Sequence, residues 1–138
     1  MGLFMVGKLV AQEEGMGCGI ACVASALGIT YQEARQLSDR PEGSYLNGYN
    51  CKDLANTLNK KGRNYIYKKF KSEHKILLEK PGTIVFVKEG DGDIWGHYLL
   101  KTLNGWMDCW INWPSINPAK AGYHENIIGE PKWIIYEN

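Results

Sequence analysis

The dipeptide Asn104-Gly105 constrains the fold of this chain more than any other short feature. It stands between two apolar runs, residues 97–103 and 106–113, and that pattern is the strongest short-range signal of a β-hairpin with a type I′ turn. Three further segments combine β-branched and aromatic residues as strands do, at residues 64–70, 83–88 and 132–136. The second half of the chain is therefore expected to form an antiparallel sheet.

The first third of the chain carries helix signals instead. A small apolar segment over residues 18–27 ends at Gly28, a residue suited to the left-handed position after a helix. Thr30 and Glu33 have the spacing of a capping box at the start of a second helix. A third helix is predicted within residues 50–62. Helices followed by an antiparallel sheet predict an α+β fold.

The composition is that of an ordinary globular domain. Of 138 residues, 44% are hydrophobic and 22% are charged, close to the average for folded domains, so we expect one domain over residues 1–138. The net charge is +1 and there is no basic run, which excludes binding to nucleic acid through neutralised phosphates. No apolar run approaches the ~20 residues of a membrane-spanning helix, and we expect no insertion into a membrane.

The first residues do not have the pattern of an export signal. Lys8 lies within the apolar stretch, Gly7 interrupts that stretch, and no small-residue cleavage site follows. We therefore expect a cytoplasmic protein whose four cysteines are reduced.

Cys18 has the surroundings that a nucleophile needs. It lies between Gly17 and Gly19 and opens the first predicted helix. The N-terminus of a helix carries about half a positive charge, which favours a thiolate and makes a cysteine nucleophilic near neutral pH. Glycines on both sides would let a substrate carbonyl approach the backbone closely. The remaining cysteines lack this combination: Cys22, Cys51 and Cys109.

A thiol nucleophile also needs a base, and His97 is the best placed of the three histidines. It follows Gly96 and begins an apolar strand, so we expect it at a sheet edge above a cleft. His74 lies among charged residues on a solvated face, and His124 falls in a long loop predicted over residues 114–131.

The predicted hairpin also suggests a residue that orients the His97 ring. Centring the turn on residues 104–105 makes the numbers of facing residues add up to 209, which places Asn112 opposite His97, about 5 Å away. The same register pairs Lys101 with Asp108, two opposite charges. Asp108 shares the His97 face but lies four residues along the strand, about 13 Å away. Asp108 is therefore the alternative third member of a triad.

Several of these residues resemble a known family. Gln12 stands six positions before the first cysteine of the segment Cys-Gly-Ile-Ala-Cys at residues 18–22. This arrangement resembles the bacterial double-glycine-leader peptidases, which process bacteriocins and are papain-like cysteine peptidases. Similar stretches at residues 43–46, 81–85 and 96–100 extend the resemblance over about residues 12–114. The resemblance implies a papain-like fold, with N-terminal helices packed on an antiparallel β-sheet.

The resemblance also implies roles for individual residues. Cys18 would be the nucleophile, His97 the base, and Gln12 a donor to the oxyanion. The chain departs from the family at Gly17, where an acidic residue is usual, and at Asn112, where the family usually has aspartate directly before proline. The family is best known as N-terminal domains of exporters, whereas we expect a stand-alone peptidase domain here.

The expected function is therefore a cysteine peptidase that cleaves a peptide or protein substrate through an acyl-enzyme, using Cys18, His97 and Asn112. Three residues are expected to line the substrate: Gly17, Trp95 and Trp110. The expected reaction implies no cofactor. No metal is expected either, because Cys18, Cys22 and His97 make too poor a ligand set. Two alternatives remain open: a thiol acyltransferase or deamidase with the same triad, and an inactive peptide-binding module of the same fold.

Overall fold

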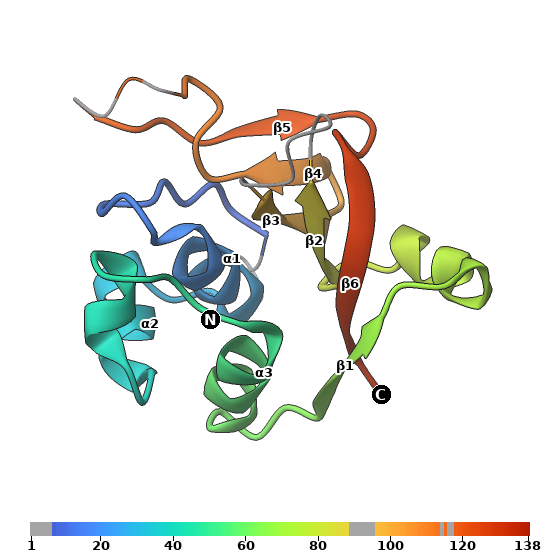
Figure 1. The fold of residues 1–138 in the computed structure, drawn as a ribbon, viewed down its shortest axis with the longest axis horizontal. Helices are drawn as coiled ribbons and strands as arrows, with labels where there is room; N and C mark the ends of the chain where they lie inside the picture. Colours follow the sequence, from blue (N-terminus) through green and yellow to red (C-terminus); the bar gives the residue numbers. More distant parts are fainter. Residues whose placement is uncertain (1–6, 89–95, 114, 116–117) are drawn as a thin grey trace.

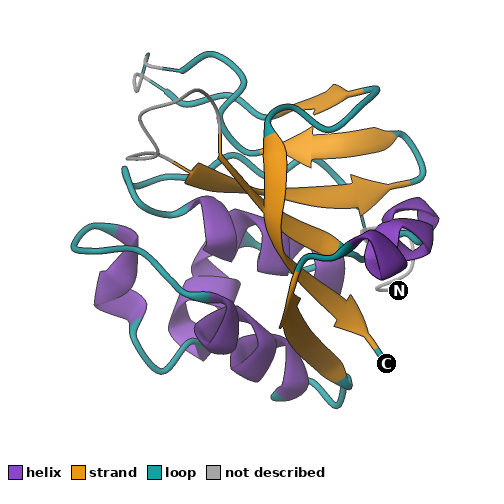
Figure 2. Cartoon of the chain, turned by 45° about the vertical axis from the view of Figure 1, so that its right-hand side comes forward, coloured by secondary structure: helices purple, strands orange, loops and turns teal. Residues whose placement is uncertain are grey.

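The computed structural model of the protein describes residues 7–88, 96–113, 115 and 118–138. Within these residues the chain has an α+β fold, in which helices pack on a six-stranded antiparallel sheet (Figure 1). Figure 2 shows the α-helices gathered on one face of that sheet. The predicted fold class is confirmed.

The helix layer comes first along the chain and the sheet follows. The helices are α1 (Cys18–Leu27), α2 (Tyr31–Leu37) and α3 (Cys51–Asn59), with 3-10 helices η2 (Pro41–Ser44) and η3 (Ser72–Glu79). The strands are β1 (Tyr65–Lys69), β2 (Ile84–Lys88), β3 (Gly96–Thr102), β4 (Gly105–Asp108), β5 (Gly122–His124) and β6 (Glu130–Glu137), in the spatial order β1-β6-β2-β3-β4-β5. None of the helices in the described residues has the length and apolarity that crossing a bilayer requires.

Local sequence signals account for the helix boundaries. Helix α1 ends at Gly28, whose φ of 71° is in the left-handed region. At the start of α2, the Thr30 hydroxyl accepts from the Glu33 N–H at 3.1 Å, and the Glu33 carboxylate accepts from the Thr30 N–H at 2.9 Å. Asn50 and Asp53 make the same reciprocal pair at the start of α3. These bonds satisfy backbone donors that a helix start leaves free.

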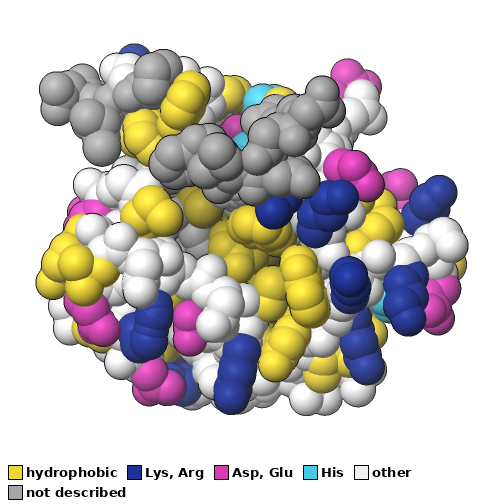
Figure 3. Space-filling model, in the orientation of Figure 1, with side chains coloured by type: hydrophobic (Ala, Val, Ile, Leu, Met, Phe, Trp, Pro, Cys, Tyr) yellow, Lys and Arg dark blue, Asp and Glu magenta, His cyan; other side chains and the backbone are white. Residues whose placement is uncertain are grey.

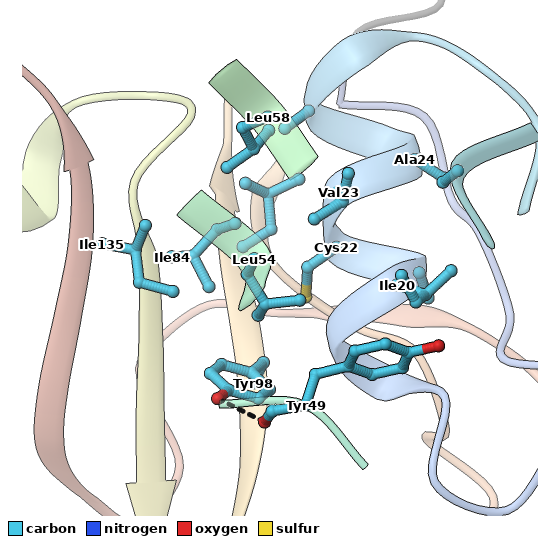
Figure 4. Close-up of a cluster of buried hydrophobic side chains, with 14 of the residues drawn as sticks. Ile20, Cys22, Val23, Ala24, Tyr49, Leu54, Leu58, Ile84, Tyr98 and Ile135 are labelled. Carbon is cyan, nitrogen blue, oxygen red and sulfur yellow. Dashed lines mark hydrogen bonds between the residues drawn. The ribbon is translucent and has the colours of Figure 1, made fainter. Parts of the chain in front are cut away.

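The sheet buries a core on each of its faces. On the helix side, Leu54 of α3 packs with Tyr98 of β3, and the Tyr98 hydroxyl donates to the Tyr49 carbonyl at 2.9 Å (Figure 4). On the opposite side, Leu99 belongs to a second apolar cluster, against which η3 packs. Since neighbouring residues of a strand point to opposite faces, His97 shares the Leu99 face and not the Tyr98 face.

The predicted hairpin is present, but its register differs from the prediction. Strands β3 and β4 pair Thr102 with Gly105 and Leu99 with Asp108, so the numbers of facing residues add up to 207 instead of 209. The turn is therefore centred on residues 103–104. The Thr102 side chain explains the shift, because its hydroxyl donates to the Gly105 carbonyl at 2.8 Å and accepts from the N–H of residue 104 at 3.0 Å.

This shift changes the neighbours of two charged residues. Lys101 faces Trp106, not Asp108, and the Lys101 ammonium lies 5.7 Å from the centre of the Trp106 ring. Asp108 moves two residues closer to His97 along the sheet. Strand β4 also ends at Asp108. Asn112 therefore lies in the turns that follow this strand, and the prediction that it belongs to the strand is wrong.

The loop predicted over residues 114–131 contains a strand. Strand β5 pairs with β4, which places His124 opposite Trp106 and Gly122 opposite Asp108. Strand β6 also begins at Glu130, two residues before the predicted start. The sheet therefore extends past the hairpin and carries a histidine that sequence analysis had assigned to a loop.

Candidate active site around Cys18

Cys18 is the first residue of α1, and its thiol lies half-buried where that helix meets the sheet. Its sulfur is in hydrogen-bond contact with the Cys109 thiol and accepts from the backbone N–H groups of Tyr98 and Gly19. The Cys109 bond is the largest influence on the Cys18 pKa, which is lowered even though burial and the negative charge of Asp108 oppose ionisation. The site therefore favours a thiolate at Cys18.

The other three cysteines are in environments that favour the thiol. Burial is the main cause that raises the pKa of Cys22 and of Cys109, and both side chains are almost completely inaccessible to solvent. Burial also raises the pKa of Cys51, which lies 3.9 Å from the Tyr98 hydroxyl. Figure 4 shows the Cys22 side chain within the core between α1 and the sheet. Cys18 alone among the four has a lowered pKa.

Packing accounts for the glycines on both sides of Cys18. Gly17 is buried, and a Cβ atom at this position would overlap the Tyr31 hydroxyl. A Cβ atom at Gly19 would lie 2.9 Å from the Leu54 methyl groups. The space beside each glycine is thus occupied by a neighbouring side chain, which weakens the premise that Gly17 admits a substrate carbonyl.

His97 lies at the beginning of β3, directly before the residue whose N–H contacts the Cys18 sulfur. Its Nε2 atom is 3.8 Å from Oδ2 of Asp108, and it is buried without a hydrogen-bond partner among the described residues. Strand β3 thus brings the His97 backbone to the end of the sheet where α1 begins, while the His97 side chain lies on the Leu99 face. Its Nε2 side faces a carboxylate that is just beyond hydrogen-bond distance.

Asp108 replaces Asn112 as the neighbour of the His97 ring. Asp108 is buried, with its side chain 11% exposed, and its Oδ1 accepts from the Trp110 N–H at 3.0 Å. The Asn112 side chain instead donates to the Pro118 carbonyl at 3.1 Å and accepts from the Lys120 N–H at 2.7 Å, so it fastens a loop. The premise for choosing Asn112 was the 209 register, which is wrong.

Gln12 is buried beside Cys109 and has a full set of partners. Its Oε1 accepts from the Cys109 thiol at 3.1 Å, and its Nε2 donates to the carbonyls of Glu14 and Gly15, both at 3.0 Å. Both amide hydrogens are therefore engaged with the loop that leads into α1. To donate to an oxyanion, Gln12 would have to release one of those carbonyls.

Of the two tryptophans predicted to line the substrate, the structure describes only Trp110. Trp110 is half-buried, donates from Nε1 to the Ser115 carbonyl at 2.7 Å, and meets the Trp113 ring edge-on at a centroid distance of 6.3 Å. Trp95 lies outside the described residues. Trp110 is close to the site through its backbone, since its N–H binds Asp108.

Sequence analysis missed two residues of this site, His124 and Cys109. Nε2 of His124 lies 2.9 Å from Oδ2 of Asp108, so two imidazoles face one carboxylate oxygen. Histidine and acidic surfaces also lie together at the top of the face drawn in Figure 3. No group of three or more His, Cys, Asp or Glu side chains in the described residues is arranged to hold a metal ion. The sequence signal for His124 was weak, because β5 has only three residues.

No protein-family model matches the chain, and no curated protein matches it significantly. The roles proposed below for Cys18, His97 and Asp108 therefore rest on contacts, burial and chemistry within this chain.

Proposed function

We propose that this protein is a thiol hydrolase acting on a peptide or amide bond, with Cys18 as nucleophile, His97 as base and Asp108 as the residue that orients the His97 ring. One observation carries the proposal. The cysteine with a lowered pKa lies at a helix N-terminus against the strand residue that follows His97, and His97 faces a buried carboxylate. A nucleophile, a base and an orienting group in this order are the parts of a papain-like triad.

The first half of the reaction forms an acyl-enzyme. His97 takes the Cys18 proton, and the thiolate attacks the substrate carbonyl carbon to give a tetrahedral oxyanion. The Cys18 N–H lies in the first turn of α1, where a backbone donor has no partner within the helix. It is the donor best placed to stabilise the oxyanion. Gln12 supports this arrangement by holding the Glu14 and Gly15 carbonyls that precede the helix.

The second half releases the products. The imidazolium of His97 gives its proton to the leaving amine as the carbon–nitrogen bond breaks, which leaves a thioester on Cys18. His97 then removes a proton from water, and the resulting hydroxide equivalent attacks the thioester to regenerate the thiol. A reducing compartment such as the cytoplasm would keep Cys18 and Cys109 as free thiols, which is their state in the structure.

A peptide-library screen tests the proposal. The wild-type protein is incubated with the library, products are identified by mass spectrometry, and the Cys18→Ala variant is treated in parallel. We expect cleaved peptides with the wild type and none with Cys18→Ala. Products carrying an added amine would indicate a transferase, and a side-chain mass gain without cleavage would indicate a deamidase.

Thiol labelling provides the companion measurement. At pH 6, iodoacetamide should modify Cys18 before the other cysteines, because only its pKa is lowered. Cys51→Ala is the matched control, since Cys51 is also half-buried at a helix start. The proposal fails if no peptide is processed and Cys51 reacts as fast as Cys18, which is the outcome expected of an inactive binding module.

A further inference from the structure

Among the described residues, two donors hold the Asp108 carboxylate, and neither of them is His97. Its Oδ1 accepts from the Trp110 N–H at 3.0 Å, and its Oδ2 lies 2.9 Å from Nε2 of His124. Since an ionised carboxylate can only accept, His124 must carry its proton on Nε2 in this contact. Nε2 of His97 is 3.8 Å from the same Oδ2 and has no other partner among the described residues.

We propose that His124 is a positioning residue, which holds Asp108 so that the second lone pair of Oδ2 is presented to His97. This inference rests on the proposed function and adds a fourth member to its triad. A carboxylate oxygen accepts two hydrogen bonds, so His97 can bind Oδ2 without displacing His124. Closing the 3.8 Å gap to the ~2.8 Å of a charge-assisted bond requires a movement of about 1 Å.

The sheet register makes this arrangement specific. Strand β5 pairs His124 with Trp106 and Gly122 with Asp108, so His124 reaches Asp108 diagonally across two neighbouring strands. Such diagonal neighbours are within reach of long side chains. Without His124, one oxygen of a nearly buried carboxylate would have no described donor other than His97. His124 therefore determines where the Asp108 charge lies relative to the base.

The titratable groups around Asp108 come from three directions. His97 approaches from β3 and His124 from β5, while α1 contributes Cys18 and Cys22 on the helix side. Cys109 follows Asp108 in the chain, and its ionisation is opposed by the Asp108 charge. Among these groups, only the two imidazoles are placed to donate to the carboxylate, so a change at His124 should be transmitted through Asp108 to His97.

Ring-nitrogen NMR of His97 tests the proposal without a substrate. We expect the wild-type His97 ring to be protonated on Nε2, which leaves Nδ1 to accept the Cys18 proton. In His124→Phe the donor is lost and the ring is replaced by one of similar size, so His97 should show a mixture of the two tautomers. His124→Gln places an N–H near the position of the imidazole Nε2–H and should restore the Nε2-protonated form. His74→Phe is the control histidine variant outside the site.

The pH dependence of Cys18 alkylation gives a second readout. If His97 is less firmly oriented, it stabilises the Cys18 thiolate less, and the alkylation rate of His124→Phe at pH 6 should fall about tenfold, the effect of one pKa unit on a thiolate fraction. His124→Gln should alkylate close to the wild-type rate. In an Asp108→Asn background, adding His124→Phe should change neither the tautomer nor the rate, because His124 acts through Asp108.

Three results would overturn the inference: a wild-type His97 tautomer in folded His124→Phe, no recovery in His124→Gln, or additive effects in the double variant. A purely structural His124 would lower the melting temperature of His124→Phe and leave both readouts unchanged. Failure of the proposed function is separately visible. If His97→Ala leaves Cys18 alkylation unchanged, His97 is not the base of Cys18, and the His97 tautomer still reports whether His124 positions Asp108.

Discussion

At the scale of single residues, the lowered pKa of Cys18 depends on a second cysteine. The single S–H of Cys109 lies between two acceptors, the Gln12 side-chain oxygen at 3.1 Å and the Cys18 sulfur. A hydrogen bond to a thiolate stabilises the charged form and lowers the pKa of the thiol. Cys109 therefore takes the place of a polar side chain beside the proposed nucleophile, while burial raises the pKa of its own thiol.

Replacing Cys109 should make Cys18 less acidic. In Cys109→Ala the hydrogen bond that most lowers the Cys18 pKa is lost, so the alkylation profile of Cys18 should move to higher pH. The shift is measured from the rate constant of Cys18 alkylation, which is followed by mass spectrometry from about pH 5 to about pH 9. Cys51→Ala is the control and should leave the profile in place. An unchanged profile in folded Cys109→Ala would show that the Cys109 thiol does not lower the Cys18 pKa and that the backbone N–H groups of Tyr98 and Gly19 are the donors that matter.

We expect Gly17 to be needed mainly because its neighbours leave no space for a side chain. Its backbone, with φ of −93° and ψ of 10°, is open to alanine, but the new methyl group would overlap the Tyr31 hydroxyl. Gly17→Ala should destabilise the protein by about 1–3 kcal/mol, the usual cost of overpacking, measured by urea unfolding. Tyr31→Phe removes the overlapping oxygen, so the double variant should be more stable than the two single effects predict. Full additivity would contradict this account of Gly17.

The sequence identified Cys18 but not the reason for its glycines. A glycine-framed cysteine before an apolar segment is visible in the printed residues, and so is the helix it begins. The contacts of Gly17 and Gly19 come from Tyr31 and Leu54, which lie far along the chain. Long-range contacts of this kind leave no local pattern in the sequence. Sequence analysis therefore explained the glycines by the approach of a substrate and not by side-chain packing.

At the scale of secondary-structure elements, the hairpin shows how an error of one residue in the predicted centre of a turn changes which side chains are expected to face each other. The apolar runs on both sides predicted the hairpin, and the Asn-Gly pair is a common signal for its turn. The Thr102 hydroxyl instead closes a turn over residues 103–104. Register follows from turn geometry, so Asp108 came next to Leu99, and the alternative orienting residue became the one beside His97.

The hairpin predicts opposite outcomes for two substitutions. Asp108→Ala removes the carboxylate that faces His97, and it should lower turnover by about 100-fold or more, as losses of triad partners do. Asn112→Ala removes only bonds to the Pro118 carbonyl and the Lys120 N–H, so turnover should be retained. Turnover of any peptide found in the library screen is the measurement, with circular dichroism to confirm folding. An active Asp108→Ala and an inactive Asn112→Ala would restore the original assignment.

At the scale of the whole molecule, the α+β arrangement was predictable and the position of the site was only partly so. The order of helix and strand signals along the chain was enough for the fold class, since capping residues such as Thr30 and Asn50 are local. The site forms where α1 meets β3, and β4 and β5 complete it. Strand β5 escaped prediction because three residues, Gly122–His124, cannot show a period.

An ion pair joins the segment that follows α3 to the end of β6. Arg63, which follows α3, binds Glu137 at the end of β6 through two hydrogen bonds of 2.7 Å each. The Arg63 guanidinium lowers the pKa of the Glu137 carboxyl. A lowered carboxyl pKa in the folded state adds stability above the unfolded pKa, and this stability is lost as pH falls through the folded pKa.

Glu137→Gln should therefore reduce the free energy of unfolding at pH 7, and the difference from wild type should shrink as the wild-type carboxyl becomes protonated below about pH 4. Both side chains of the pair are about one-third exposed, so the effect should stay under about 1 kcal/mol. Urea unfolding at neutral and acidic pH measures it. Glu130→Gln is the matched control, because Glu130 lies on the same strand and pairs with Lys132 at 3.2 Å from a much more exposed position. A Glu137→Gln deficit that is equal at both pH values would mean that packing of the side chain, and not its charge, ties β6 to the segment after α3.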